Sequence, residues 1–177
     1  MIPPAAPAAP AAAPLCLRRT PVRPEWVDYN GHMSEWCYLL VFGDSSDAFF
    51  RYVGVDERYR AGGHSLYTVE THLHHLREVA EGEPLRLTLQ LLGLDPRRLH
   101  IFHAMYHGAT GTPLATAEQM LLHVDVRAGR AVPMPSYLVA RLDAVRSAHA
   151  DLPRPAPVGH VVGIPREGAA RAVRTQL

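Results

Sequence analysis

The spacing of apolar residues predicts a long helix in the first third of the chain. Apolar residues run without a break from Trp36 to Phe42 and recur at helical spacing as far as Val53. Ser34 stands at the expected N-cap, and Glu35 follows in the first turn, where the helix dipole favours a carboxylate. A helix that is apolar on nearly every side is buried, so we expect this one at the centre of the fold. Polar residues 44–47 interrupt the pattern and predict a kink or a polar end.

Alternation of apolar and polar residues predicts five strands, one before the helix and four after it. The predicted strands cover residues 15–23, 66–73, 85–91, 99–105 and 114–125. In the second strand, one face should carry Tyr67, Val69, Thr71 and Leu73, and the other Leu66, Thr68, Glu70 and His72. Strict alternation therefore predicts that Tyr67 and Glu70 point to opposite faces of the sheet.

The C-terminal part of the chain predicts a second helix and then an irregular segment. This helix should be capped by Ser136. Its apolar face would carry Leu138, Leu142 and Val145. From Asp151 onward prolines recur and periodicity fades, with one short extended piece expected at residues 160–164. We divide the chain into a disordered Ala/Pro-rich tail (1–15), one domain (16–150) and a Pro-rich C-terminal extension (151–177).

The order of the predicted elements indicates an α+β fold. A strand, an apolar helix, four strands in a meander and a second helix suit an antiparallel sheet of about five strands wrapped around the central buried helix. One sheet can cover such a helix only in part. A second copy of the chain would extend the sheet and cover its exposed edges, so we expect a homodimer.

Composition excludes several classes of protein. All 18 basic residues among the 177 are arginines, which excludes lysine Schiff-base chemistry and a Walker-type phosphate loop. The formal net charge of +1 gives no sign of nucleic-acid binding. The longest apolar run is far shorter than the ~20 residues of a membrane span, and the start of the chain lacks the charged region of a signal peptide. Cys16 and Cys37 form no CxxC pair, so a reducing cytoplasm is the expected compartment.

The densest cluster of reactive side chains lies in residues 24–34, directly before the long helix. Asp28 precedes Gly31, which allows close approach of a ligand, and His32. The first N–H groups of a helix have no partner within it and could stabilise an oxyanion, while Asp28 attacks a carbonyl or activates water. The alternative is that Asp28 and Asn30 only build an Asx turn.

The motif Asp28-Tyr29-Asn30-Gly31-His32-Met33, followed by Tyr38 on an apolar helix, resembles the active-site segment of hot-dog fold acyl-CoA thioesterases of the 4-hydroxybenzoyl-CoA thioesterase type. Longer strings resemble the betainyl-CoA thioesterases, which occur alone or fused behind carnitine dehydrogenase. These strings are EWVDYNGHM at 25–33, LLVFGD at 39–44, YTVETH at 67–72 and ATAEQMLLHVD at 115–125. The resemblance covers residues 17–150. Ser34 departs from it, because many relatives carry Asn there.

The resemblance implies a hot-dog fold and hydrolysis of an acyl-CoA, namely betainyl-CoA to glycine betaine in carnitine breakdown. It gives Asp28 the role of catalytic carboxylate, with Gly31 and His32 beside it. It also implies that the enzyme works without a metal, and we expect no other cofactor. The exposed sheet edges separately lead us to expect a homodimer or a dimer of dimers. Arginines would bind the phosphates of coenzyme A. The candidates are Arg77, Arg97, Arg98, Arg127 and Arg130.

A trimethylammonium group prefers aromatic faces, and the chain can be tested against that preference. The candidate substrate-binding residues near the predicted site are Trp26, Tyr29, Asn30, Trp36, Tyr38 and Tyr67. Glu70 could balance the positive charge. For each aromatic residue the alternative is ordinary core packing, and for Glu70 it is a pair with an arginine.

The sequence leaves one alternative site and two alternative functions. His72 and His74 with Glu70 could hold a metal, but no further ligand is predicted and we expect no metal site. The enzyme could be a thioesterase of broad short- or medium-chain preference. The chain could also be a non-catalytic hot-dog protein that binds acyl-CoA.

Overall fold

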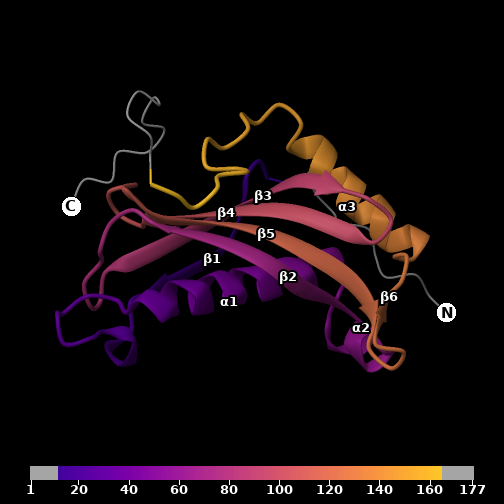
Figure 1. Cartoon of the computed structure of the whole chain (residues 1–177), viewed down its shortest axis with the longest axis horizontal. Coiled ribbons are helices and arrows are strands. Elements are labelled where there is room, and N and C mark those ends of the chain that lie inside the picture. Colours follow the sequence, from indigo (N-terminus) through magenta and orange to yellow (C-terminus); the bar gives the residue numbers. More distant parts are fainter. Residues whose placement is uncertain (1–11, 165–177) are drawn as a thin grey trace.

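The computed structural model describes residues 12–164, and the expectations for residues 1–11 and 165–177 lie outside this range. One long helix, α1 (Glu35–Val53), runs along the concave side of a curved antiparallel sheet (Figure 1). Its bounds agree with the predicted helix, and Gly54 ends it in the left-handed conformation, with φ of 95°. Within the described residues, no helix is long and apolar enough to cross a membrane.

The sheet contains the five predicted strands and one short addition. They are β1 (Leu15–Pro21), β2 (His64–His75), β3 (Pro84–Leu94), β4 (Arg98–His107), β5 (Pro113–Asp125) and β6 (Arg130–Ala131). The spatial order is β1-β3-β4-β5-β2, with β6 paired to β5. Strand β2 therefore lies at one edge of the sheet, and the five strand pairs of the described residues are antiparallel. The predicted α+β hot-dog architecture is confirmed.

Helix α1 is buried on one side only in a single chain, in line with the expectation that one sheet covers the helix only in part. Phe42 and Phe49 are fully buried against the sheet, whereas Trp36, Leu39 and Leu40 are exposed. One curved sheet covers one side of a helix, so the apolar residues on the opposite side stay open in a single chain. These three residues form what we call the apolar stripe of α1.

Residues 44–47 do not kink or end the helix. Ser45 and Ser46 are buried, and the two flanking aspartates turn outward to arginines. Asp44 accepts a hydrogen bond from Arg18 at 2.9 Å, and Asp47 accepts one from Arg51 at 2.8 Å. The polar segment is thus accommodated inside a continuous helix because each of these carboxylates finds a cation.

Two short helical elements were not predicted. The second predicted helix begins at Ser136, the residue that was expected to be its N-cap. A 3-10 helix covers Pro24–Trp26, and α2 (Glu57–Ala61) is capped by Asp56, whose side chain accepts from Tyr59 N at 2.9 Å. Helix α3 (Ser136–Ala148) includes Ser136 as its first residue, so Pro135 takes the N-cap position. Its residues Leu138, Leu142 and Val145 are buried in one core cluster with Phe49, as predicted.

The C-terminal extension crosses the face of the sheet opposite to α1 (Figure 1). We call this the outer face. His149 begins the crossing: its Nδ1 accepts from Leu91 N at 3.0 Å, and its Nε2 donates to Ala12 O at 3.1 Å. Further along, Gly159 N donates to a Glu118 carboxylate oxygen at 2.8 Å. Residues 160–164 form no strand, so the expected extended piece is wrong.

Candidate active site

Two loops lie side by side at the N-terminal end of α1. The first, residues 22–34, enters the helix, and the second, residues 76–83, joins β2 to β3. Val22 N donates to Glu83 O at 2.9 Å, Met33 N donates to Val79 O at 2.8 Å, and His32 forms a β-bridge with Ala80. Backbone pairing therefore fixes the second loop against the loop that carries the predicted catalytic residues.

Asp28 is held in a tight turn. Its Oδ1 accepts from Asn30 N at 2.8 Å, its C=O accepts from Gly31 N at 3.0 Å, and its own N–H donates to His32 O at 3.0 Å. Gly31 has φ of 80°, which a residue with a side chain rarely adopts. The Asx turn weighed as an alternative is thus present. It uses one carboxylate oxygen of Asp28 and leaves the second for other chemistry.

His32 faces a carboxylate from the second loop. Its Nδ1 lies 3.4 Å from Glu78 Oε2, and the Glu78 side chain is 74% exposed. Glu78 was not among the residues singled out from the sequence. The two residues are 46 positions apart, and a glutamate in a loop between strands gives no local signal of such a contact.

Ser34 takes the N-cap position of α1 without using its side chain as a cap. Its N–H donates to Trp26 O at 2.8 Å, and within the described chain its hydroxyl makes no capping hydrogen bond. The first N–H groups of the helix are therefore not satisfied by the cap side chain, and they point toward the end of α1 that holds Asp28.

The aromatic residues divide into a buried pair and an exposed pair. Trp26 and Tyr38 are only 4% and 3% exposed, whereas Tyr29 and Trp36 are 96% and 63% exposed. Tyr38 donates its hydroxyl to Arg77 O at 3.2 Å, and burial, followed by the charge of Glu78, raises the pKa of Tyr38 to about 12. Trp26 and Tyr38 thus support the loops from beneath, as in the core-packing alternative, while Tyr29 and Trp36 are free to contact a ligand.

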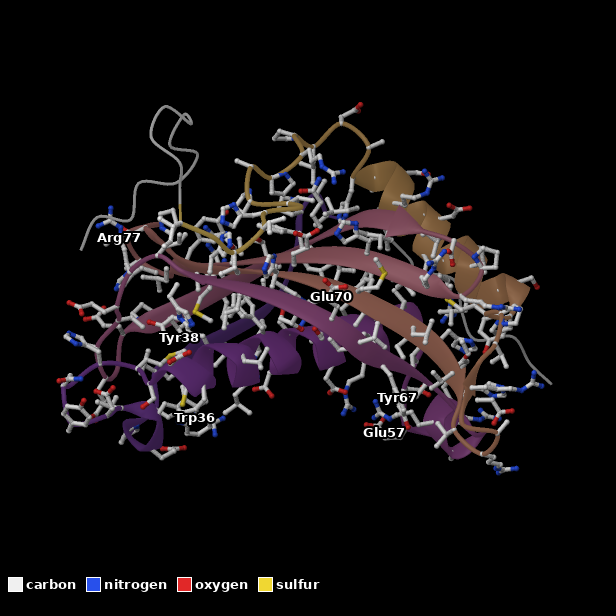
Figure 2. All side chains as sticks on the ribbon, in the orientation of Figure 1. Trp36, Tyr38, Glu57, Tyr67, Glu70 and Arg77 are labelled. Atoms are coloured by element: carbon white, nitrogen blue, oxygen red, sulfur yellow. The ribbon has the colours of Figure 1, made fainter. Side chains whose placement is uncertain are left out.

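Tyr67 and Glu70 lie away from this cluster (Figure 2). An extra residue in β2, Val69, breaks the alternation, because Thr68 pairs with Leu121 and Glu70 with Met120. The predicted alternation is therefore wrong beyond Thr68. Tyr67 and Glu70 both belong to the outer face, opposite the buried face that α1 covers, so a single chain does not bring either of them to Asp28.

The two loops are rich in negative charge. Their acidic residues, with the first residue of α1, are Glu25, Asp28, Glu35, Glu78, Glu81 and Glu83, against two arginines, Arg23 and Arg77. Arg23 stacks over the ring of Trp26, with 5.0 Å between its Cζ atom and the ring centroid. Of the five arginines considered for phosphate binding, Arg77 lies in these loops. A positively charged ligand group is the natural complement of this end of the molecule.

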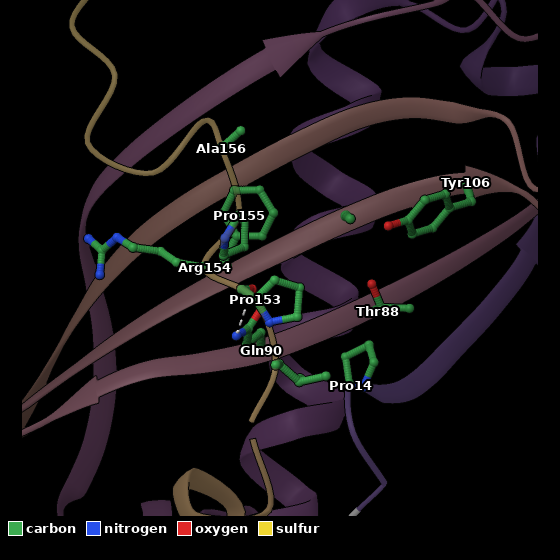
Figure 3. Close-up of a pocket in the computed structure, with 11 residues that line it drawn as sticks. Pro14, Thr88, Gln90, Tyr106, Pro153, Arg154, Pro155 and Ala156 are labelled. Carbon is green, nitrogen blue, oxygen red and sulfur yellow. Dashed lines mark hydrogen bonds between the residues drawn. The ribbon is translucent and has the colours of Figure 1, made fainter. Parts of the chain in front are cut away.

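A groove lies on the outer face and is separate from these loops (Figure 3). It has a volume of about 380 Å³ and lies between the Pro-rich segment 152–156 and side chains of β3 and β4 that include Thr88, Gln90 and Tyr106. None of the residues predicted for catalysis or substrate binding lines it. His72 and His74 also lie on this face, where His74 contacts His160 edge to face. Among residues 12–164, no group of three or more His, Cys, Asp or Glu side chains is placed to hold a metal ion.

Comparisons with known proteins point to one family. The family model described as "Thioesterase-like superfamily" matches residues 22–142. A betainyl-CoA thioesterase of Pseudomonas aeruginosa is 50% identical over 147 residues, which cover 82% of this chain and 92% of that protein. An L-carnitine dehydrogenase/betainyl-CoA thioesterase of Rhizobium meliloti is 50% identical over 153 residues, 86% of this chain. The chain spans about a third of the length of that fused relative, 31%.

The solved structures agree with this assignment. The crystal structure of a thioesterase candidate from Pseudomonas putida is 35% identical, with a TM-score of 0.77, and covers 88% of this chain and 100% of that one.

Proposed function

Because this chain belongs to the thioesterase-like superfamily, we propose that it hydrolyses betainyl-CoA to glycine betaine and free coenzyme A. The observation that carries the proposal is the turn before α1 that holds Asp28: one carboxylate oxygen accepts from Asn30 N, and the backbone N–H of Asp28 donates to His32 O. The choice of substrate is supported by a relative named betainyl-CoA thioesterase, which is 50% identical over 82% of this chain.

The geometry suits attack on a thioester carbonyl. With the carbonyl oxygen directed at the first N–H groups of α1, the negative charge of a tetrahedral intermediate meets preorganised donors. Asp28 either attacks the carbonyl carbon or takes a proton from the attacking water. Collapse of the intermediate breaks the C–S bond, and the sulfur leaves as the coenzyme A thiol after gaining a proton. When water attacks, its oxygen ends directly in the carboxylic acid. When Asp28 attacks, collapse leaves a mixed anhydride on Asp28, which water then hydrolyses to the free acid and the regenerated carboxylate. Gly31 gives the backbone the turn that places Asp28, and His32 holds the other side of that turn.

The exposed aromatic faces support a cationic acyl group. Tyr29 lies in the loop before α1 and Trp36 in its first turn, and both rings are exposed in a single chain. A cation–π contact contributes about 0.5–1 kcal/mol at an exposed site and about 2 kcal/mol once it is desolvated. Trp26 and Tyr38 hold these elements from within the core, and Asn30 shapes the turn. Arg77 is the arginine we assign to a coenzyme A phosphate.

The working unit is a homodimer, alone or as a dimer of dimers. The apolar stripe of α1 is exposed in a single chain, and Tyr67 and Val69 are exposed on the edge strand β2. Apolar surface on a helix next to an unpaired strand edge favours a second copy of the chain. We expect the enzyme in the cytoplasm, where reduced thiols such as Cys16 and Cys37 persist.

Release of coenzyme A thiol measured over a panel of acyl-CoA substrates tests this function. We expect betainyl-CoA to have the highest kcat/KM. A comparable rate on neutral short- and medium-chain substrates would favour a broad-specificity thioesterase. Tight binding of acyl-CoA without thiol release from any substrate would favour a non-catalytic binding protein.

A further inference from the structure

The chemistry of the proposed substrate limits where its counter-charge can lie. In a betainyl thioester, one methylene separates the quaternary nitrogen from the carbonyl carbon. A carboxylate that recognises the ammonium must therefore belong to the same group of residues as the one that acts on the carbonyl. Glu70, on the outer face, does not meet this condition within one chain.

Most carboxylates of the two loops are already engaged. Glu25 pairs with Arg23 at 3.7 Å, and Glu83 pairs with the His107 ring. Asp28 is assigned to the chemistry itself. Glu78 differs from Glu25 and Glu83 in the position of its partner. Its carboxylate contacts His32, and the backbone C=O of His32 accepts the N–H of Asp28, so Glu78 belongs to the same group of residues as Asp28. Asp28 and Glu78 thus both contact His32, one from each loop: the backbone N–H of Asp28 reaches the His32 C=O, and the Glu78 carboxylate reaches the His32 ring.

We propose that Glu78 is the carboxylate that recognises the quaternary ammonium of the substrate and so selects a cationic acyl group. This inference rests on the proposed thioesterase function and adds the specificity residue to it. The exposed faces of Tyr29 and Trp36 supply the aromatic part of the same recognition.

A negative charge at this position discriminates between substrates in the transition state. The oxyanion that forms on a neutral acyl group is destabilised by a carboxylate nearby. When the acyl group carries its own cation, the carboxylate is neutralised, and the cation lies beside the developing oxyanion. Glu78 therefore favours the cationic substrate, because it attracts the ammonium group. It disfavours the neutral substrate, because it repels the oxyanion.

The test compares betainyl-CoA with the uncharged analogue in which a tert-butyl group replaces trimethylammonium. We expect the wild-type protein to prefer betainyl-CoA at least tenfold in kcat/KM. In Glu78→Gln this ratio should fall about tenfold, through loss on betainyl-CoA and gain on the analogue. Glu81→Gln is the matched control: it removes the same charge from the same exposed loop, and in the described chain Glu81 has no ion pair. Its ratio should match the wild type.

Two results would overturn the inference while leaving the thioesterase function intact. An equal loss on both substrates in Glu78→Gln would show that Glu78 acts only through the orientation of His32. A ratio that collapses in Glu70→Gln but not in Glu78→Gln would assign the recognition to β2 of a second copy. The absence of thiol release from both substrates in the wild type would instead refute the proposed function.

Discussion

Ser46 of α1 and His103 of β4 are joined by a hydrogen bond of 3.0 Å in the buried space between helix and sheet. Ser46 donates its own proton to Gln119 Oε1 at 3.1 Å, so the imidazole Nε2–H donates to Ser46 and Nδ1 carries no proton. Within residues 12–164, His103 Nδ1 has no hydrogen-bond partner. A second proton on this ring would place a charge in the core, and burial accordingly lowers the pKa of His103 to about 4.

We predict that this histidine makes the fold sensitive to acid. The pKa of histidine is 6.5 in the unfolded chain, so between pH 6.5 and about 4 the unfolded state binds more protons at this site. The free energy of unfolding is at its full value above pH 6.5 as far as His103 is concerned, and it decreases as the pH is lowered. At pH 5 the loss from His103 alone is about 2 kcal/mol. Urea unfolding of wild type and His103→Gln at pH 7 and pH 5 measures this contribution. Equal pH dependence in both proteins would contradict it.

Asp28→Asn should separate the chemistry of Asp28 from its role in the turn. The asparagine side-chain oxygen can still accept from Asn30 N, so the melting temperature should stay within about 2 °C of wild type. Loss of the carboxylate should lower kcat by a factor of ~100 or more. Asp28→Ala should lose both turn and activity. Near-normal turnover of betainyl-CoA by Asp28→Asn would remove this residue from the mechanism.

The apolar stripe of α1 should hold the dimer together. Leu40→Arg places a charge within the stripe and should convert the dimer to a monomer at micromolar concentration. Ala150→Arg, at an exposed position two residues after the end of α3, is the control and should remain dimeric. Sedimentation velocity decides between these outcomes. A wild-type protein that sediments as a monomer would contradict the proposed interface.

His149 should stabilise the C-terminal extension. Its ring accepts the buried N–H of Leu91, and His149→Phe leaves that donor unpaired at a cost of about 2 kcal/mol. Arg154→Gln, an exposed change in the same segment, should alter the free energy of unfolding by less than about 0.5 kcal/mol. Urea unfolding at pH 7 measures both. A His149→Phe protein as stable as wild type would show that the hydrogen bond contributes no net stability.

Local pattern determined the elements of this protein. The apolar run from Trp36 to Val53, opened by Ser34 and Glu35, was enough to predict α1, because helix formation depends on spacing and capping within the segment itself. Alternation was likewise enough for the five long strands. The loop with Asp28, Gly31 and His32 was recognisable because a turn and its reactive residues are close in sequence.

Tertiary structure decided which of the candidate residues meet. Val69 occupies one extra place in β2 and turns Glu70 to the outer face, a shift that arises in pairing with β5 and leaves no mark on the sequence pattern. The contact of Glu78 with His32 depends on loop 76–83 lying against loop 22–34. Both features come from contacts between distant segments, whose geometry is set by the packing of the whole sheet and not by the local preferences of either segment.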